Sequence, residues 1–244
     1  NPMHFRSTEK MLEHAKHLSS LAPNIAIKAP CVSAGLDAIE EMTALGICVN
    51  VTVSFSVPQA LIAAERIERG LVRAQANGID INKFTPYVTI MVGRLDDQLK
   101  RAMARDKISI DPGYLEWAGV AAFKKAYQIF QERGYRSKLL SAAYRNHMHW
   151  SEFIGGDAVV SMPYEWWTRF NNSDVEVIPR MDIPVKSEII DELYKKFHDF
   201  RISYDEDGMN ESDFVHFGAT IHTLNQFISG YQNLLSLIRE SILV

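Results

Sequence analysis

Short runs rich in β-branched residues alternate with longer amphipathic segments along most of this chain, and this alternation constrains the fold more than any other feature. Strands are predicted at 24–29, 47–55, 86–92, 138–144 and 157–162. Helices are predicted between them at 33–46, 57–78 and 116–133. Strands that alternate with helices over short connections predict an α/β fold with a parallel sheet, either open or closed into a barrel.

Three further amphipathic segments flank this unit and are predicted to be helices: 8–20, 185–200 and 212–243. Ser33 stands where a helix N-cap is expected, and Gly46 and Asn77-Gly78 stand where helices are expected to stop. Most apolar positions of the C-terminal helix are expected to pack into the core. The alternatives are that this helix covers a barrel opening or forms a homodimer face.

Composition excludes several classes of function. The 244 residues carry a formal net charge of −4, which gives no basic surface for nucleic acid or for an anionic membrane. No apolar run has the roughly 20 residues that a membrane span requires, and the first 20 residues resemble an amphipathic helix rather than a signal peptide. Cys31 and Cys48 lack metal-site spacing. They predict reduced thiols in a cytoplasmic protein.

Polar residues lie on strands that should otherwise be apolar. Lys28 falls near the end of the first predicted strand, where desolvation of an ammonium group is costly. Asn50, Thr52 and Ser54 follow each other at every second position of the next strand, so they are predicted to share one face. Polar residues on one strand face, next to a lysine, predict a lined interior such as the mouth of a barrel.

Two arginines follow the next strands. Arg94 comes just after the strand at 86–92, and Arg145 comes just after the strand at 138–144. The carboxyl ends of neighbouring parallel strands meet at one rim, so the two guanidinium groups are expected to converge. A pair of guanidinium groups suits a phosphate, which it binds through charge-assisted hydrogen bonds.

These residues carry a resemblance. The segment "NIAIKAPCVSAGLDAIEEMTALGICVNVTVSFSVPQALIAAE" resembles the transaldolase family, whose pattern is Ile-Lys, a glycine-containing helix, and Asn-x-Thr before Phe-Ser. Further on, "TIMVGRLDD", "AAYRN" and "VVSMP" resemble the later strand ends of the family. The resemblance runs from about residue 24 to residue 170, and the order and spacing of the fragments make it specific.

The resemblance implies a class I aldolase built on a (β/α)8 barrel, active in carbohydrate metabolism such as the pentose phosphate pathway. Lys28 then corresponds to the Schiff-base lysine, which burial would keep unprotonated. Asn50 corresponds to the residue that contacts the bound three-carbon unit, and Thr52 to the one that holds a catalytic water. Arg94 and Arg145 correspond to the phosphate-binding pair. Sugar phosphates are the implied substrates, with no metal or other cofactor.

Several departures from the family pattern limit what it implies. The aspartate of the first strand and the glutamate of the third have no counterpart, so we expect the chain to hold only barrel strands four to eight. In that case the sequence is a piece, or another chain completes the barrel. We assign residues 1–170 to the barrel and 171–244 to a C-terminal helical extension of one domain. Thr89 stands where many relatives have Ser or Ala, and Met91 stands where they have Phe or Tyr. The resemblance assigns that Tyr as the acid catalyst of the fructose-6-phosphate aldolase branch, so Met91 argues against that branch.

Other interpretations remain open. His147 and His149 are spaced so that they could share a metal, as in a zinc hydrolase. Residues 95–115 form a longer connection than the family pattern suggests, and a solvated loop is the default for them, with a lid or an interface as alternatives. The protein is predicted to be a transaldolase. The alternatives are a non-catalytic relative that binds sugar phosphates, a lyase that releases dihydroxyacetone, or an enzyme for an atypical ketose.

Overall fold

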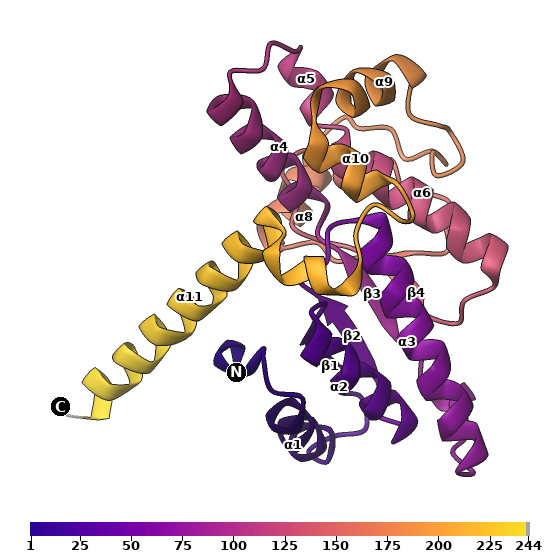
Figure 1. The fold of residues 1–244 in the computed structure, drawn as a ribbon, viewed down its shortest axis with the longest axis vertical. Helices are drawn as coiled ribbons and strands as arrows, with labels where there is room; N and C mark the ends of the chain where they lie inside the picture. Colours follow the sequence, from indigo (N-terminus) through magenta and orange to yellow (C-terminus); the bar gives the residue numbers. More distant parts are fainter. Residues whose placement is uncertain (243–244) are drawn as a thin grey trace.

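A five-stranded parallel sheet forms the centre of the computed structural model, which describes residues 1–242 (Figure 1). Its strands follow each other in sequence order, and all four pairings are parallel. They are β1 (Ile27–Pro30), β2 (Val49–Thr52), β3 (Tyr87–Ile90), β4 (Lys138–Ser141) and β5 (Val159–Val160). The predicted α/β fold with a parallel sheet is therefore confirmed, although every strand is shorter than its sequence pattern.

Helices precede, connect and follow the strands. They are α1 (Thr8–Ser19), α2 (Ser33–Ala44), α3 (Val57–Ala76), α4 (Val92–Asp106), α5 (Pro112–Leu115), α6 (Ala118–Arg133), α7 (Met148–Ser151), α8 (Tyr164–Asn171), α9 (Ser187–Lys196), α10 (His198–Tyr204) and α11 (Gly218–Ile242). Short 3₁₀ helices lie at η1 (Pro2–His4), η2 (Ile81–Lys83) and η3 (Glu211–His216). No helix within residues 1–242 is long and apolar enough to cross a membrane.

The helices predicted at 8–20, 33–46, 57–78 and 116–133 are all present. The one predicted at 185–200 is two helices, because Phe197 adopts an extended conformation between α9 and α10. The segment predicted at 212–243 begins as η3 and continues as α11, and residue 243 lies outside the described residues. Ser33 is not a cap, since Val32 occupies the N-cap position of α2. Gly46 does end α2, with φ of 75°.

The prediction of a solvated loop at 95–115 is wrong. Residues 95–106 continue α4, and the side chains of Leu95, Leu99 and Ala102 are buried in the core. The spacing of these three residues places them on one face of a helix, which provides a physical reason for the helical conformation. Only the short segment between α4 and α5 remains irregular.

One face of the sheet packs into the core. Ala29, Val51, Val88 and Leu139 are paired in register across four strands and are all buried. Paired residues of parallel strands point to the same side of the sheet. Helices α2 and α3 contact the first three strands, so this is the side that the helical layer covers.

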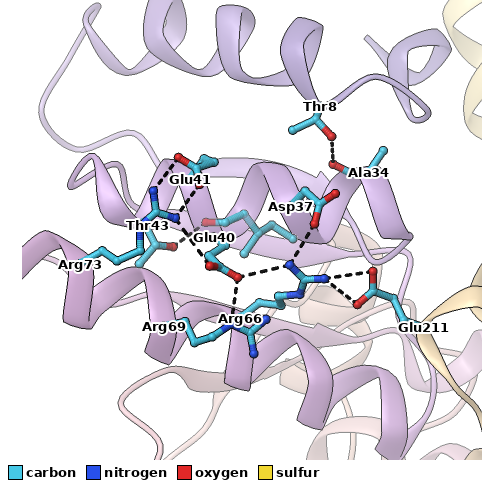
Figure 2. A network of polar contacts seen from close by, with 11 residues as sticks. Thr8, Ala34, Asp37, Glu40, Glu41, Thr43, Arg66, Arg69, Arg73 and Glu211 are labelled. Carbon is cyan, nitrogen blue, oxygen red and sulfur yellow. Dashed lines mark hydrogen bonds and ion pairs between the residues drawn. The ribbon is translucent and has the colours of Figure 1, made fainter.

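The first two of these helices are held close together (Figure 2). A Cβ atom added to Gly70 of α3 would lie 2.7 Å from the carbonyl oxygen of Glu40 in α2, so only glycine allows this approach. Above the contact, Arg66 forms ion pairs with Asp37 and Glu40 of α2 and with Glu211 of η3. The network therefore ties the helical layer of the sheet to the C-terminal part of the chain.

The C-terminal helix departs from its prediction. We expected most of its apolar positions to pack into the core, but α11 extends away from the rest of the molecule (Figure 1). Only its first turns are buried, at Ala219, Thr220, Thr223 and Leu224. The apolar residues further along are exposed: Leu234, Leu235, Leu237, Ile238 and Ile242.

Candidate functional site

Lys28 lines a pocket of about 160 Å³ at the β1 edge of the sheet. The pocket is lined by residues 1–18, by the ends of β1 and β2, and by α11. Its other lining residues include His4, His14, Thr52 and Phe227. It therefore joins Lys28 to Thr52 and to residues close to both ends of the chain, which no local sequence pattern placed together.

Lys28 itself is exposed, so the expectation that it is buried is wrong for this structure. Its neighbours in β1, Ile27 and Ala29, are buried. Successive residues of a strand point to opposite faces, and the helical layer covers only the face that carries Ala29. The ammonium group thus lies on the other face of the sheet.

The residues paired with Lys28 are polar. Lys28 pairs with Asn50 across β1 and β2, and Asn50 pairs with Tyr87 of β3. The Thr89 hydroxyl donates a hydrogen bond of 2.7 Å to the Asn50 side-chain oxygen. Among the described residues the amide nitrogen of Asn50 has no hydrogen bond of its own. Thr89 therefore fixes the orientation of the Asn50 amide beside Lys28.

The end of β2 differs from the prediction of one continuous polar face. Thr52 is half-buried, and its hydroxyl lies 3.9 Å from the sulfur of Met91. Val53 then adopts φ of 55°, which breaks the alternation of the strand. Ser54 is fully buried, and its hydroxyl has no hydrogen-bond partner among the described residues. The prediction that Ser54 shares a face with Asn50 and Thr52 is therefore wrong.

The two arginines do approach each other. Arg94 lies in the first turn of α4, and Arg145 lies in the loop after β4. Burial lowers the pKa of Arg94, and the positive charge of Arg145 lowers it further. The guanidinium of Arg145 forms an ion pair of 2.7 Å with Asp97. The Nε of Arg94 is buried without a hydrogen-bond partner in residues 1–242. Two such cations with a single carboxylate between them favour the binding of an anion.

Sequence reasoning missed a fully buried pair beside these arginines. Nε2 of His149 lies 2.8 Å from Oδ2 of Asp96, and both side chains are fully buried. The two residues are 53 positions apart, so no spacing rule connects them. His147 and His149 do not come together on a metal site, and within residues 1–242 no group of three or more His, Cys, Asp or Glu residues is arranged to hold a metal ion.

The predicted site residues therefore fall into two groups. Lys28 and Thr52 line the pocket, with Asn50 and Thr89 next to them on the sheet. Arg94 and Arg145 lie outside the pocket lining. The sheet joins the two groups, because Thr89 belongs to β3, whose carboxyl end leads directly into α4 and Arg94.

Comparison with known proteins gives one family. The model of the "Transaldolase/Fructose-6-phosphate aldolase" family matches residues 1–234. Transaldolase 1 of Streptomyces avermitilis is 34% identical over 134 residues, which are 54% of this chain and 35% of that protein. A probable transaldolase of Clostridium tetani is 32% identical over 160 residues, which are 65% of this chain and 58% of that protein.

A transaldolase of Thiobacillus denitrificans is 33% identical over 127 residues, which are 51% of this chain and 35% of that protein. The chain thus spans between about one third and three fifths of the length of these curated relatives.

Proposed function

Because this chain belongs to the transaldolase/fructose-6-phosphate aldolase family, we propose that it transfers a dihydroxyacetone unit between sugar phosphates. A ketose phosphate is the donor and an aldose phosphate the acceptor. Lys28 is the residue that forms the Schiff base. The observation that supports this most is the placement of Lys28 beside Asn50, whose amide is held by Thr89.

The chemistry follows from a primary amine on this face. The Lys28 nitrogen adds to the ketone carbon of the donor, and loss of water gives an iminium ion. The hydroxyl on carbon 4 then loses its proton to water, and the electrons of the bond between carbons 3 and 4 move to the iminium. This releases an aldose phosphate, whose aldehyde forms at carbon 4, and leaves an enamine on Lys28. Attack of the enamine on an acceptor aldehyde reverses these steps. The iminium is itself the electron sink, so the reaction requires no cofactor.

Each neighbouring residue has a role in the proposal. The free amide nitrogen of Asn50 donates to a hydroxyl of the bound three-carbon unit, and Thr52 holds a water for hydrolysis of the iminium. Thr89 orients Asn50. Ser54, which is fully buried and does not line the pocket, has no place in this mechanism.

The phosphate of the substrate binds to Arg94 and Arg145. Arg94 supplies a guanidinium whose Nε lacks a partner, and Asp97 orients the guanidinium of Arg145. A bidentate contact with phosphate is the geometry for which guanidinium groups are suited.

We further propose that β1 to β5 are strands four to eight of a (β/α)8 barrel. Sequential parallel strands with helices between them are the topology of such a barrel. Residues 1–170 then form the barrel portion and 171–244 a helical extension of the same domain. The protein is proposed to be a cytoplasmic homodimer, since the two cysteines are free thiols and α11 exposes apolar residues.

A second candidate function is a non-catalytic relative that binds sugar phosphates. The exposure of Lys28 favours it, because a lysine at a strand end whose side chain extends into solvent needs no catalytic role. A lyase that releases dihydroxyacetone, or an enzyme for an atypical ketose, differs from the main proposal in its products with and without an acceptor aldose.

Borohydride trapping tests the proposal. The protein is incubated with fructose 6-phosphate, reduced, and examined by peptide mapping. We expect a three-carbon adduct on Lys28 that is absent from Lys28→Ala. Lys138→Ala is a matched control, because Lys138 belongs to the same row of paired residues but is held by Asp157. A six-carbon adduct would mean that the lysine reacts without cleavage. No adduct with any ketose phosphate would favour the binding protein.

A further inference from the structure

The buried pair of Asp96 and His149 has no part in the chemistry proposed so far. Asp96 lies in α4, and His149 lies in α7. The Asp96 side chain accepts two hydrogen bonds: one from the backbone N–H of Gly119, at 2.9 Å, and one from Nε2 of His149. A charged group that is fully buried is costly unless it is paired and hydrogen-bonded.

The hydrogen bonds fix the tautomer of the imidazole. Nδ1 of His149 lies 3.0 Å from the backbone nitrogen of Arg145 and accepts its N–H. A ring nitrogen that accepts a hydrogen bond carries no proton. The single proton of the neutral ring is therefore on Nε2, where it is donated to Asp96.

The backbone that His149 holds is strained. Ala143 has φ of 64°, a left-handed conformation that costs a residue with a Cβ atom about 1–2 kcal/mol. A Cβ atom on Gly93 would lie 2.2 Å from the Ala143 carbonyl oxygen and 2.7 Å from Cγ of Arg145. The loop from 143 to 145 thus packs directly on the start of α4, with Ala143 held in an unfavourable conformation.

Several charged groups lie near the pair. Lys100 of α4 forms an ion pair with Glu116, and the Asn146 amide donates to Glu116 at 2.7 Å. The same amide lies 3.3 Å from Nε2 of His149. Arg145, whose backbone N–H is held by His149, forms an ion pair with Asp97 through its side chain. These contacts leave the neutral imidazole as the bridge between the helix and the loop.

We propose that Asp96 and His149 are positioning residues that fix the Arg145 loop, and with it the guanidinium group that meets the substrate phosphate. The proposal rests on the proposed role of Arg145 in phosphate binding. Asp96 fixes the proton on Nε2 of His149, so that Nδ1 is free to accept the Arg145 N–H. The backbone of Arg145 then places its side chain where it pairs with Asp97 close to Arg94.

The isosteric variant Asp96→Asn tests this chain of contacts. The Gly119 N–H still requires an oxygen acceptor, so the new amide nitrogen must face Nε2 of His149. The imidazole proton then moves to Nδ1, where it opposes the N–H of Arg145. Loss of this bond, with a buried donor left unpaired, should raise the KM for fructose 6-phosphate by about tenfold or more. Trapping of dihydroxyacetone on Lys28 should stay within about twofold, because that ketone has no phosphate.

Three readouts separate positioning from mere stability. Nitrogen NMR of the imidazole should show the Nε2–H tautomer in the wild type and the Nδ1–H tautomer in Asp96→Asn. His149→Gln, which offers both an acceptor and a donor, should keep the KM near the wild-type value, whereas His149→Leu should raise it. In an Arg145→Ala background, Asp96→Asn should add less than about a twofold change, since coupled residues are not additive. Asp157→Asn, on a distant surface, is the control.

The outcomes distinguish this inference from the proposed function. If the wild type neither turns over nor traps any ketose, the catalytic proposal fails, and titration with inorganic phosphate still compares the wild type with Asp96→Asn. Weaker phosphate binding in the variant would support the positioning role. An Nδ1–H tautomer in the wild type, a changed tautomer with unchanged phosphate affinity, or no phosphate binding by the wild type would overturn it.

Discussion

Two residues with left-handed backbone mark the carboxyl ends of the central strands. Val53 follows β2 with φ of 55°, and Ala143 follows β4 with φ of 64°. Side chains with a Cβ atom pay about 1–2 kcal/mol for such a conformation, and a β-branched valine is an unusual choice. Strain of this kind collects at functional sites, where the surrounding structure holds it in place. Both residues lie at the rim that carries Thr52 and Arg145.

Thr89 acts on the site through a single hydrogen bond. Thr89→Val keeps the shape of the side chain but removes the donor to Asn50 at 2.7 Å. The Asn50 amide then rotates more freely, and one hydrogen bond contributes roughly 1 kcal/mol. We expect kcat/KM to fall by up to about tenfold, as measured by a coupled assay with fructose 6-phosphate and an acceptor aldose. Thr89→Ser, which retains the hydroxyl, should keep most of the activity. Full activity of Thr89→Val would contradict the role.

Among the elements, α4 carries the phosphate site on one face and its support on another. Arg94 and Asp97 are three residues apart, so they lie on the same side of the helix, where Arg145 meets them. Asp96 lies between them in sequence but points into the core toward His149. A single helix thus delivers the anion-binding group and the residue that fixes its partner loop.

The contact between α2 and α3 gives a prediction about pH. The Arg73 guanidinium donates to Glu41 and holds the pKa of that carboxyl below its ordinary value of 4.5 (Figure 2). A lowered acid pKa contributes stability above that value, and the contribution is lost as the pH falls through the lower pKa of the folded state. Because the Glu41 side chain is 42% exposed, solvent screens most of the effect.

Glu41→Gln should therefore lower the free energy of unfolding by at most about 0.5 kcal/mol near neutral pH. The difference from the wild type should shrink as the pH falls below 4.5 and through the lowered pKa of the folded Glu41 carboxyl, because the protonated carboxyl no longer forms the ion pair. Urea denaturation at a series of pH values measures it. Glu132→Gln, which removes a carboxylate without an ion pair in the described chain, is the control and should show no such dependence. A difference that persists in acid would assign the effect to packing.

At the scale of the whole molecule, α11 is an element whose apolar side chains are left uncovered. Its second half exposes a row of apolar residues that includes Leu234 and Ile238, four positions apart on one side of the helix. If this face joins two copies of the chain, Ile238→Lys together with Leu234→Lys should weaken the dimer by at least about 100-fold. Sedimentation velocity over a range of concentrations measures the change. Asn233→Lys, on the same helix, should leave it intact, and a wild-type monomer at every concentration would refute the prediction.

The sequence by itself determined the α/β class, the order of the strands and the family. These depend on local properties: β-branched runs, the period of the helices, and glycines at turns such as Gly46. The placement of Lys28 and Asn50 on neighbouring strands could also be predicted, because alternating strands and helices pair consecutive strands in parallel. Local patterns could not give the exact strand ends, since the left-handed conformation of Val53 is imposed by packing rather than by a turn residue.

Only the tertiary structure decided the surroundings of these residues. It left Lys28 exposed, enclosed Ser54, paired Arg145 with Asp97, and joined Asp96 to His149 across 53 positions. The physical reason is that burial and electrostatic pairing depend on which distant segments pack together. A periodic pattern specifies the face on which a side chain lies, but it does not specify what covers that face.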